Sequence, residues 1–309
     1  MKGRRMARAA WLAGTLALAA GTAAEGQIDI QWRPTHSRVV LMAPIDAEIR
    51  IDNQTGRDWT LGPGGDAELS FRVEGQDGML VRPEGRGLVR ERVVLENGAT
   101  TKFQVDILDG YVPPRPESYM LSPVLELGDG AGRFGGARMS LEIQPGLEVA
   151  RREYGLASAG TDRTATLRVI HRGREDIVFF RLDGPSAGLC YGVHELGSII
   201  RYFQPQLEWD GRSVCHVLFQ TAPDRFMHAR FGMRGEPYPK EIYMAQVGSI
   251  RLARDGGQVV VLGGTRFEED PELEGQLTAP NLPPVVKDRG GDGTMLTPKA
   301  LEKKHFWQQ

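Results

Sequence analysis

Apolar and polar residues alternate with a period of two along the first half of the chain. In residues 68–73 and 103–107 every second side chain is apolar, which is the pattern of a strand with one buried face. Turn-forming clusters at 52–56 and 96–98 separate such runs. Further short strand-like runs lie at 48–51, 93–95, 119–121 and 139–143. The pattern predicts about seven strands that pack as a sandwich over residues 27–146.

The strand pattern resumes after Pro145-Gly146, where we expect the first domain to end. Residues 164–170 and 177–182 are both rich in apolar and β-branched side chains, and a turn sequence at 172–174 lies between them. Two such runs around a short turn indicate an antiparallel pair. We therefore expect a second antiparallel β domain over residues 147–267, and the fold class is all-β.

Two segments of this second domain resemble each other. In 207–218 and in 250–262 an Asp-Gly turn joins an alternating run to a Val-rich run, and Asp210 and Asp255 are 45 residues apart. That interval falls within the period of propeller blades. However, about 120 residues hold three blades at most, and closed propellers need four or more. We favour two ordinary hairpins in one sheet, so the domain is a second sandwich, with a partial propeller-like sheet as the alternative.

The first domain resembles the immunoglobulin-like domains of uncharacterised secreted bacterial proteins and, more distantly, the β-sandwich of a bacillar intracellular proteinase inhibitor. The resemblance rests on strand rhythm, an Asn-x-x-Gly turn and a tyrosine late in the domain. It is carried by residues 49–56, 68–81, 92–107, 110–121 and 139–146. The domain departs from antibody domains because it has no cysteine pair, and we expect no core tryptophan. The resemblance implies a fold and no particular activity.

Residues 1–24 are typical of a secretory signal peptide. Four basic residues precede an uncharged Ala/Leu-rich run at 9–20, and small residues follow at 21–24. About twelve apolar residues span under 20 Å as a helix, which is short of the roughly 30 Å hydrocarbon core. The first cysteine is Cys190, so no thiol is available near the leader for lipid attachment. We expect a secreted or periplasmic protein that does not span the membrane after cleavage.

Removal of the leader also changes the charge. The whole chain has 38 basic and 40 acidic residues and a net charge of −2. The leader carries four of the basic residues and none of the acidic ones, so the mature chain has 34 against 40 and a net charge of −6. Nucleic acid carries negatively charged phosphates, so an acidic chain of this kind does not attract it. We expect no nucleic-acid partner.

The last part of the chain has a different composition. Residues 268–309 are rich in proline, glycine and acidic residues and poor in apolar ones. Such a segment buries too little apolar surface to order itself, so we expect a flexible tail. Residues 296–307 have the pattern of a short helix, which is marginal in isolation. Phe306 and Trp307 could dock this tail on a partner.

Cys190 and Cys215 are the only cysteines, and the predicted compartment is oxidising. A disulfide between them would close a loop of about 25 residues and stabilise the fold by roughly 3 kcal/mol. A free pair stays open as the alternative, because the hairpin at Asp210 brings Cys215 near residues that do not include Cys190. A zinc site from these cysteines with His194 and His216 is disfavoured, because consecutive strand residues point to opposite faces. We expect no metal and no cofactor.

Motifs for covalent catalysis are weak. Cys190 with His216 or His228 and Asp224 could form a cysteine-protease triad, but no helix N-terminus is evident that would lower the thiol pKa. No Gly-x-Ser-x-Gly motif occurs. The many carboxylates could include a glycosidase pair, but nothing selects one. We therefore predict no catalytic residues.

Aromatic and basic residues gather between positions 191 and 243. Aromatic faces beside polar groups suit the binding of sugars or peptide side chains, although most rings in strands belong to the core. We select Tyr202, Trp209, Arg225 and His228 as candidates for an exposed ligand-binding patch.

The sequence therefore favours a non-catalytic binding or assembly protein of the cell envelope that contacts a protein or a glycan. The alternative is a secreted hydrolase that acts on polysaccharide or peptide through the second domain. Convergent carboxylates in a cleft would favour the hydrolase. A flat aromatic face or an exposed sheet edge would favour binding.

Overall fold

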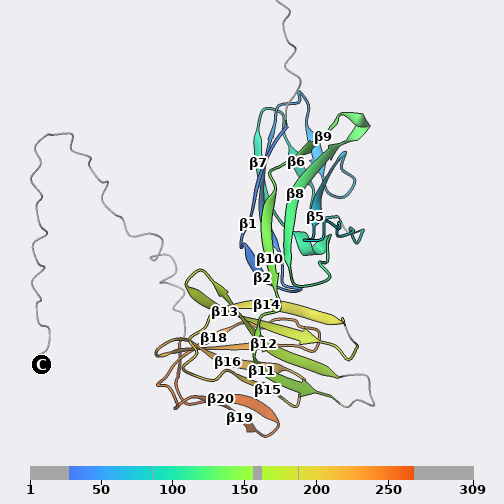
Figure 1. Ribbon diagram of the computed structural model, residues 1–309. Helices are drawn as coiled ribbons and strands as arrows, with labels where there is room; N and C mark the ends of the chain where they lie inside the picture. Colours follow the sequence, from blue (N-terminus) through green and yellow to red (C-terminus); the bar gives the residue numbers. More distant parts are fainter. Residues whose placement is uncertain (1–27, 86, 156–161, 187, 268–309) are drawn as a thin grey trace, which may run out of the picture. The chain divides into compact units, whose positions relative to one another are not determined.

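The computed structural model describes residues 28–85, 87–155, 162–186 and 188–267, and these residues are almost entirely β (Figure 1). They form 21 strands and two short 3-10 helices, η1 (Ile107–Asp109) and η2 (Gly128–Gly130). The all-β prediction is confirmed. The predicted signal peptide and the predicted tail at 268–309 lie outside the described residues. Within the described part, no helix is long and apolar enough to cross a membrane.

The first half of the described chain forms two facing sheets and a small ribbon. One sheet has the order β1-β3-β7, the other has the order β2-β10-β8-β5 with β9 also paired to β8, and β4 pairs with β6. The strands are β1 (Ile28–Pro34), β2 (Arg38–Val40), β3 (Asp46–Asn53), β4 (Trp59–Leu61), β5 (Ala67–Glu74), β6 (Val93–Leu95), β7 (Thr100–Asp106), β8 (Ser118–Leu127), β9 (Gly132–Gly135) and β10 (Met139–Gln144).

Alternation in the sequence decides which side of these strands is buried. In β5 the odd-numbered residues from Ala67 to Val73 are buried, and their partners on β8 are buried as well. The two inner faces meet in a core that includes Trp32 and Trp59. The expectation of no core tryptophan is therefore wrong. Trp59 begins the three-residue strand β4, which is too short to mark its buried side, whereas Trp32 alternates with Ile28 and Ile30 on the buried side of β1.

One strand pair departs from the antiparallel pattern. β2 pairs in parallel with β10, so that Arg38–Val40 lie beside Glu142–Gln144. β10 then continues through Pro145-Gly146 into the next strand. Gly146 has a φ of 70°, and a Cβ there would lie 3.0 Å from the Cβ of Arg168, so both conformation and space favour glycine.

The second half also forms two facing sheets, together with a separate hairpin. One sheet has the order β11-β12-β13-β14, the other has the order β15-β16-β17-β18-β21, and β19 pairs with β20. The strands are β11 (Leu147–Tyr154), β12 (Arg163–Arg172), β13 (Glu175–Asp183), β14 (Cys190–Ser198), β15 (Gln206–Trp209), β16 (Cys215–Ala222), β17 (Arg225–Phe231), β18 (Glu241–Met244), β19 (Arg251–Asp255), β20 (Gln258–Leu262) and β21 (Thr265–Phe267).

Apolar side chains from both of these sheets form one core, so this half is a second sandwich. Phe180 of β13 stacks on Phe231 of β17, with ring centroids 3.9 Å apart. The predicted pairing of 164–170 with 177–182 is confirmed by β12 and β13. Both Asp-Gly segments form hairpins, but β15–β16 belongs to the five-stranded sheet and β19–β20 is a separate ribbon. They are therefore neither two hairpins of one sheet nor parts of four-stranded blades.

Contacts join the two halves within the part of the chain up to Phe267, which clusters as one compact unit. Arg172 donates a hydrogen bond to the carbonyl of Arg38, and Arg181 donates one to that of Leu41, both at 3.1 Å. The first core also includes Phe179 of β13. The boundary expected near residue 146 stays a prediction, because these contacts cross it.

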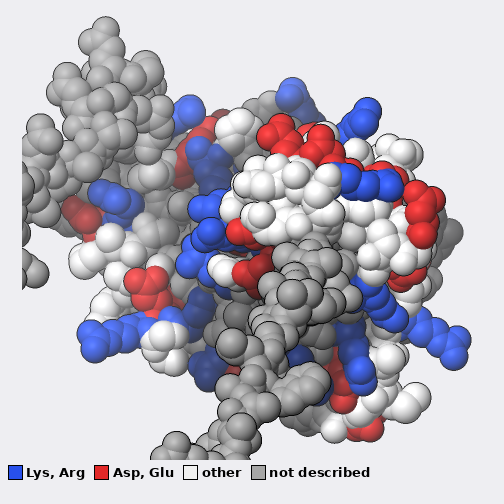
Figure 2. All heavy atoms as spheres, turned by 90° about the horizontal axis from the view of Figure 1, so that it is seen from above, with Lys and Arg blue, Asp and Glu red and all other residues white. Residues whose placement is uncertain are grey.

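Lys and Arg side chains alternate with Asp and Glu side chains over the face shown in Figure 2. In the described part of the chain many arginines form ion pairs, such as Arg57 with Asp66 at 3.0 Å and Arg138 with Glu74 at 3.0 Å. Mixed signs of this kind keep a surface soluble without creating a strong field of one sign.

The stacked phenylalanine pair generates a stability prediction. Phe231 is 2% exposed, so Phe231→Ala leaves a cavity between the two sheets. We expect the free energy of unfolding in urea to fall by about 3 to 5 kcal/mol. Tyr202→Ala is the control, because Tyr202 is 83% exposed and should change stability by at most about 0.5 kcal/mol. Equal effects of the two substitutions would show that this core does not hold the sandwich together.

Candidate functional site

The four residues selected for a ligand-binding patch do not lie on one surface. Tyr202 and Arg225 are exposed, whereas Trp209 is 3% and His228 4% exposed. Trp209 ends β15 on its inward-facing side and packs on Tyr154, with ring centroids 4.8 Å apart. His228 lies on β17, between two paired strands. The prediction of one exposed patch is therefore wrong for two of its members.

The two cysteines are free thiols in different surroundings. Cys190 pairs with Asp183 of β13 and packs against the first core. Cys215 lies opposite Trp209 and Phe231 and is buried in the second core. The predicted disulfide is thus not formed in this structure, because the strand neighbours of each cysteine are other residues.

The thiols are also poor nucleophiles. Burial raises the pKa of the Cys190 thiol and raises that of Cys215 strongly. A catalytic cysteine needs the opposite shift, because the thiolate is the reactive form. Within the described residues, no three His, Cys, Asp or Glu side chains gather as a metal site. His216 explains part of this, since it faces away from the core that holds Cys215.

A line of polar side chains is buried on the other face of β16. His216 lies opposite Arg230 and His228 lies opposite Leu218, so the two histidines are diagonal neighbours on one face. His216 Nδ1 lies 3.0 Å from His228 Nε2. His228 Nδ1 lies 3.1 Å from Oε2 of Glu241 on β18.

The other end of this line is a carboxylate in the β15–β16 turn. His216 Nε2 lies 3.5 Å from Oδ2 of Asp210, whose Oδ1 accepts hydrogen bonds from the amides of Arg212 and Val214. The turn is also tied to the β19–β20 hairpin, because the Gly211 amide donates to the Gly257 carbonyl at 2.7 Å. The order is therefore carboxylate, imidazole, imidazole, carboxylate. We call Asp210, His216, His228 and Glu241 the histidine line.

Proton counting limits the hydrogen bonds in the histidine line. Its three links need three protons, but two neutral imidazoles carry two and ionised carboxylates carry none. One of the three links therefore lacks a hydrogen, and the tautomers of the two rings decide which one it is.

The electrostatics agree with two neutral rings. Burial lowers the pKa of His228 to about 4, although the hydrogen bond to Glu241 opposes this. Burial also lowers the pKa of His216. Burial opposes ionisation of Glu241 as well, but the hydrogen bond with His228 and the charge of Arg230 hold its pKa below the ordinary value. The two histidine side chains are almost completely buried, at 7% and 5% exposure, so we assign the histidine line to the fold rather than to ligand binding.

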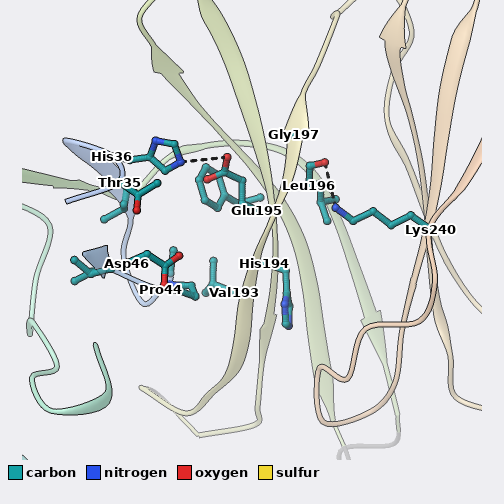
Figure 3. A pocket seen from close by; sticks show the side chains of 14 residues that line it. Thr35, His36, Pro44, Asp46, Val193, His194, Glu195, Leu196, Gly197 and Lys240 are labelled. Atoms are coloured by element: carbon teal, nitrogen blue, oxygen red, sulfur yellow. Dashed lines mark hydrogen bonds and ion pairs between the residues drawn. The ribbon is translucent and has the colours of Figure 1, made fainter. Parts of the chain in front are cut away.

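A polar cavity of about 420 Å³ opens beside the edge strand β14 (Figure 3). Figure 3 shows the His36 ring turned toward the Glu195 carboxylate, 4.0 Å away, and Lys240 reaching the Leu196 carbonyl at 3.5 Å. Asp46 lines the same cavity. It therefore brings together side chains of both charges.

Glu195 is the most constrained of these groups. Arg172 donates to both of its carboxylate oxygens, at 2.9 and 3.0 Å. His194, the neighbour of Glu195, packs on Phe231, and burial lowers the pKa of its ring. Both oxygens of Glu195 therefore already have a partner within the fold.

A larger groove of about 1110 Å³ lies on the outer face of β5 and β8. It is bounded by the segment 78–83 and by β9. Met79 is 70% and Leu80 53% exposed, and Phe134 of β9 also lines the groove. Arg72, Arg82 and Arg133 are its charged lining residues. We call this feature the β5–β8 groove.

Sequence reasoning did not select the β5–β8 groove. The signal was present at Gly75 to Val81, where an Asp-Gly turn precedes a Met-Leu-Val run. If such a run formed a strand, part of it would be buried. In the structure the run returns along β5 instead, and the main chain of Val81 donates to Val73, which leaves Met79 and Leu80 on the outside.

Comparisons with known proteins add little. No protein-family model and no curated protein matches this chain. Among solved structures, the crystal structure of Spo0M, a sporulation control protein from Bacillus subtilis, shares 11% sequence identity over 80% of this chain and 92% of that chain, with a TM-score of 0.21. A likeness of this degree carries no argument for fold or function. The immunoglobulin-like resemblance stays a prediction, and the structure shows the coarser all-β sandwich.

The free thiols generate the first prediction from this part of the molecule. Without reductant, we expect a thiol reagent to titrate two thiols per chain in denaturant and to react slowly with the native protein, because Cys215 is buried. Cys190→Ser should leave one thiol in denaturant. Finding no reactive thiol in the denatured protein would show that the bridge forms.

The histidine line generates a pH prediction. An unfolded histidine has a pKa near 6.5, and the pKa of folded His228 is about 4, so the unfolded chain binds more protons between these values. Stability is therefore full above pH 6.5 and falls as the pH is lowered toward 4, by roughly 3 kcal/mol for this residue. Urea unfolding at several pH values measures the slope.

Two variants isolate the residue responsible. His228→Gln should reduce this slope, whatever its effect on stability at pH 7, and the part that remains is due to His216, whose pKa burial also lowers. His171→Gln is the control, because the His171 side chain is 64% exposed, and it should leave the slope unchanged. An unaltered slope in His228→Gln would contradict the assignment. Nitrogen chemical shifts should also show the His228 ring neutral at pH 7.

Proposed function

We propose that the protein is a non-catalytic binding or assembly module of the cell envelope that contacts a protein or a glycan. The leader-like residues 1–24 support a secreted or periplasmic location. The β5–β8 groove is the observation that carries the binding role. Exposed apolar side chains with a polar rim mark interaction sites on soluble proteins. Met79 and Leu80 meet that description, with arginines around them.

The geometry of the groove supports binding because the apolar side chains are held in place. The Gly75 amide donates to the Met79 carbonyl at 2.9 Å, and the Val81 amide donates to the Val73 carbonyl at 2.9 Å. Asp77 also accepts from the Met79 amide. A partner that binds a fixed surface does not have to order it first, which favours affinity.

The hydrolase alternative has less support. Asp46 and Glu195 both line the polar cavity, which is the arrangement that would favour hydrolysis. However, Arg172 donates to both oxygens of Glu195, so this carboxylate is already engaged within the fold. Among the described lining residues of the β5–β8 groove there is no carboxylate. Binding is the function that these sites support better.

A ligand screen tests the binding role. The mature chain is mixed with envelope glycan fragments and with peptides, and its melting temperature and any released products are measured. We expect a ligand at 100 times its Kd to stabilise the fold by about 2.7 kcal/mol, which raises the melting temperature by a few degrees, with no product formed. The double variant Met79→Ser and Leu80→Ser should lose the shift.

The control for this screen removes apolar side chains elsewhere. Leu147 and Val247 are 58% and 51% exposed and lie outside the groove, so Leu147→Ser with Val247→Ser should keep the shift. A shift that survives the groove substitutions would overturn the proposed site. Turnover that disappears in Glu195→Gln or Asp46→Asn would overturn the non-catalytic role.

A further inference from the structure

The β5–β8 groove is basic on a chain that is acidic. Its described lining residues include Arg72, Arg82 and Arg133 and no Asp or Glu. The whole chain has a net charge of −2. A concentration of one sign in a concave region attracts ligands of the opposite sign more strongly than the net charge suggests.

Two of these three arginines have no partner in the described part of the molecule. Arg72 forms an ion pair with Glu74 at 3.2 Å. For Arg82 and Arg133, no carboxylate lies within 4.0 Å among the residues that the structure describes, whereas most arginines elsewhere in the sandwich have one. An incoming carboxylate would therefore meet two guanidinium groups without displacing an existing pair.

The apolar lining of the groove is more aliphatic than aromatic. Met79 and Leu80 are its most exposed apolar side chains, and methionine adapts its shape to irregular partners. Tyr111 also lines the groove, but it is buried and its hydroxyl accepts a hydrogen bond from the Phe71 amide. Sugar rings are usually bound on open aromatic faces. This lining suits apolar side chains of a polypeptide better than it suits sugar rings.

The groove also has a form that fits an extended chain. Ser70, Arg72, Ser122 and Val124 lie on the outward side of the paired strands β5 and β8. On such a face every second residue of a strand presents its side chain, and an extended segment laid along it presents its own side chains at the same spacing. Arg82 and Arg133 belong to the two elements that border it, the segment 78–83 and β9.

We infer that the β5–β8 groove binds an extended acidic segment of a polypeptide partner, whose apolar side chains contact Met79 and Leu80 while its carboxylates pair with Arg82 and Arg133. This inference rests on the proposed binding function and names the class of partner. Charge pairs and apolar contacts both contribute to this binding. Salt screens the charge pairs only, so raising the salt concentration should weaken the binding without abolishing it.

The test uses the mature chain and a fluorescent ten-residue peptide of alternating Glu and Leu, with anisotropy as the signal. A matched peptide of alternating Lys and Leu has the same apolar content and the opposite charge. We expect the acidic peptide to bind at least tenfold more tightly than the basic one. Raising the salt concentration from 0.05 to 0.5 M should lower the affinity for the acidic peptide several-fold, because the Debye length shortens from more than 10 Å to a few ångströms.

Charge reversal assigns the binding to the groove. Arg82→Glu with Arg133→Glu should lower the affinity for the acidic peptide at least tenfold and raise the affinity for the basic one. Arg50→Glu with Arg92→Glu is the matched control, because both arginines are exposed, lie outside the groove and should leave binding unchanged. All four substitutions are on the surface, and unchanged melting temperatures would confirm that the variants fold.

The outcomes separate this inference from the proposed function. If an acidic polysaccharide binds through Arg82 and Arg133 and neither peptide does, the polypeptide class is wrong and the binding function stands. If both peptides bind equally, or if charge reversal has no effect, the inference is overturned. If no ligand of either kind depends on Met79, Leu80 or the arginines, the proposed function fails together with it.

Discussion

Strand β16 is covered on both faces, and this double burial constrains the second half of the molecule. Every residue from Cys215 to Gln220 is buried. One face packs into the core between the two large sheets, and the β19–β20 hairpin lies over part of the other, where Leu218 meets Leu252 and Val259. A polar residue on the second face cannot reach water. His216 must therefore find its partners within the fold, which explains why the histidine line exists and why burial controls its protonation.

The β5–β8 groove shows the opposite condition. There, a turn closed by main-chain hydrogen bonds holds apolar side chains in solvent, and they do not pack into a core. The two features are opposite exceptions to the usual exposure of polar residues and burial of apolar ones. Burial makes the polar residues of β16 part of the scaffold, whereas exposure makes the apolar residues at Met79 and Leu80 available to another molecule.

The alternation of apolar and polar residues was enough to predict most strands and the all-β class. It works where one face is solvated, as in β5. It gives no direction for β16, whose buried run has no period of two, and so it could not show that His216 and His228 meet. Trp209 is different, because it alternates with Leu207 along β15, and the same pattern places it on the buried side. Exposure of Met79 and Leu80 depends on a reversal of the chain that brings Val81 back to Val73. Such pairings are decided by the whole fold, so a local pattern does not reveal them.

The parallel pairing of β2 with β10 has a consequence for the order in which the protein can form during synthesis. About one hundred residues separate Arg38–Val40 from Glu142–Gln144. At roughly 5 to 20 residues per second, a ribosome needs about 5 to 20 seconds to deliver the second partner after the first. During that interval β2 has no neighbour on this side, and the first sandwich remains open. The strand that closes it leads directly into β11, so completion of the first sandwich coincides with the start of the second.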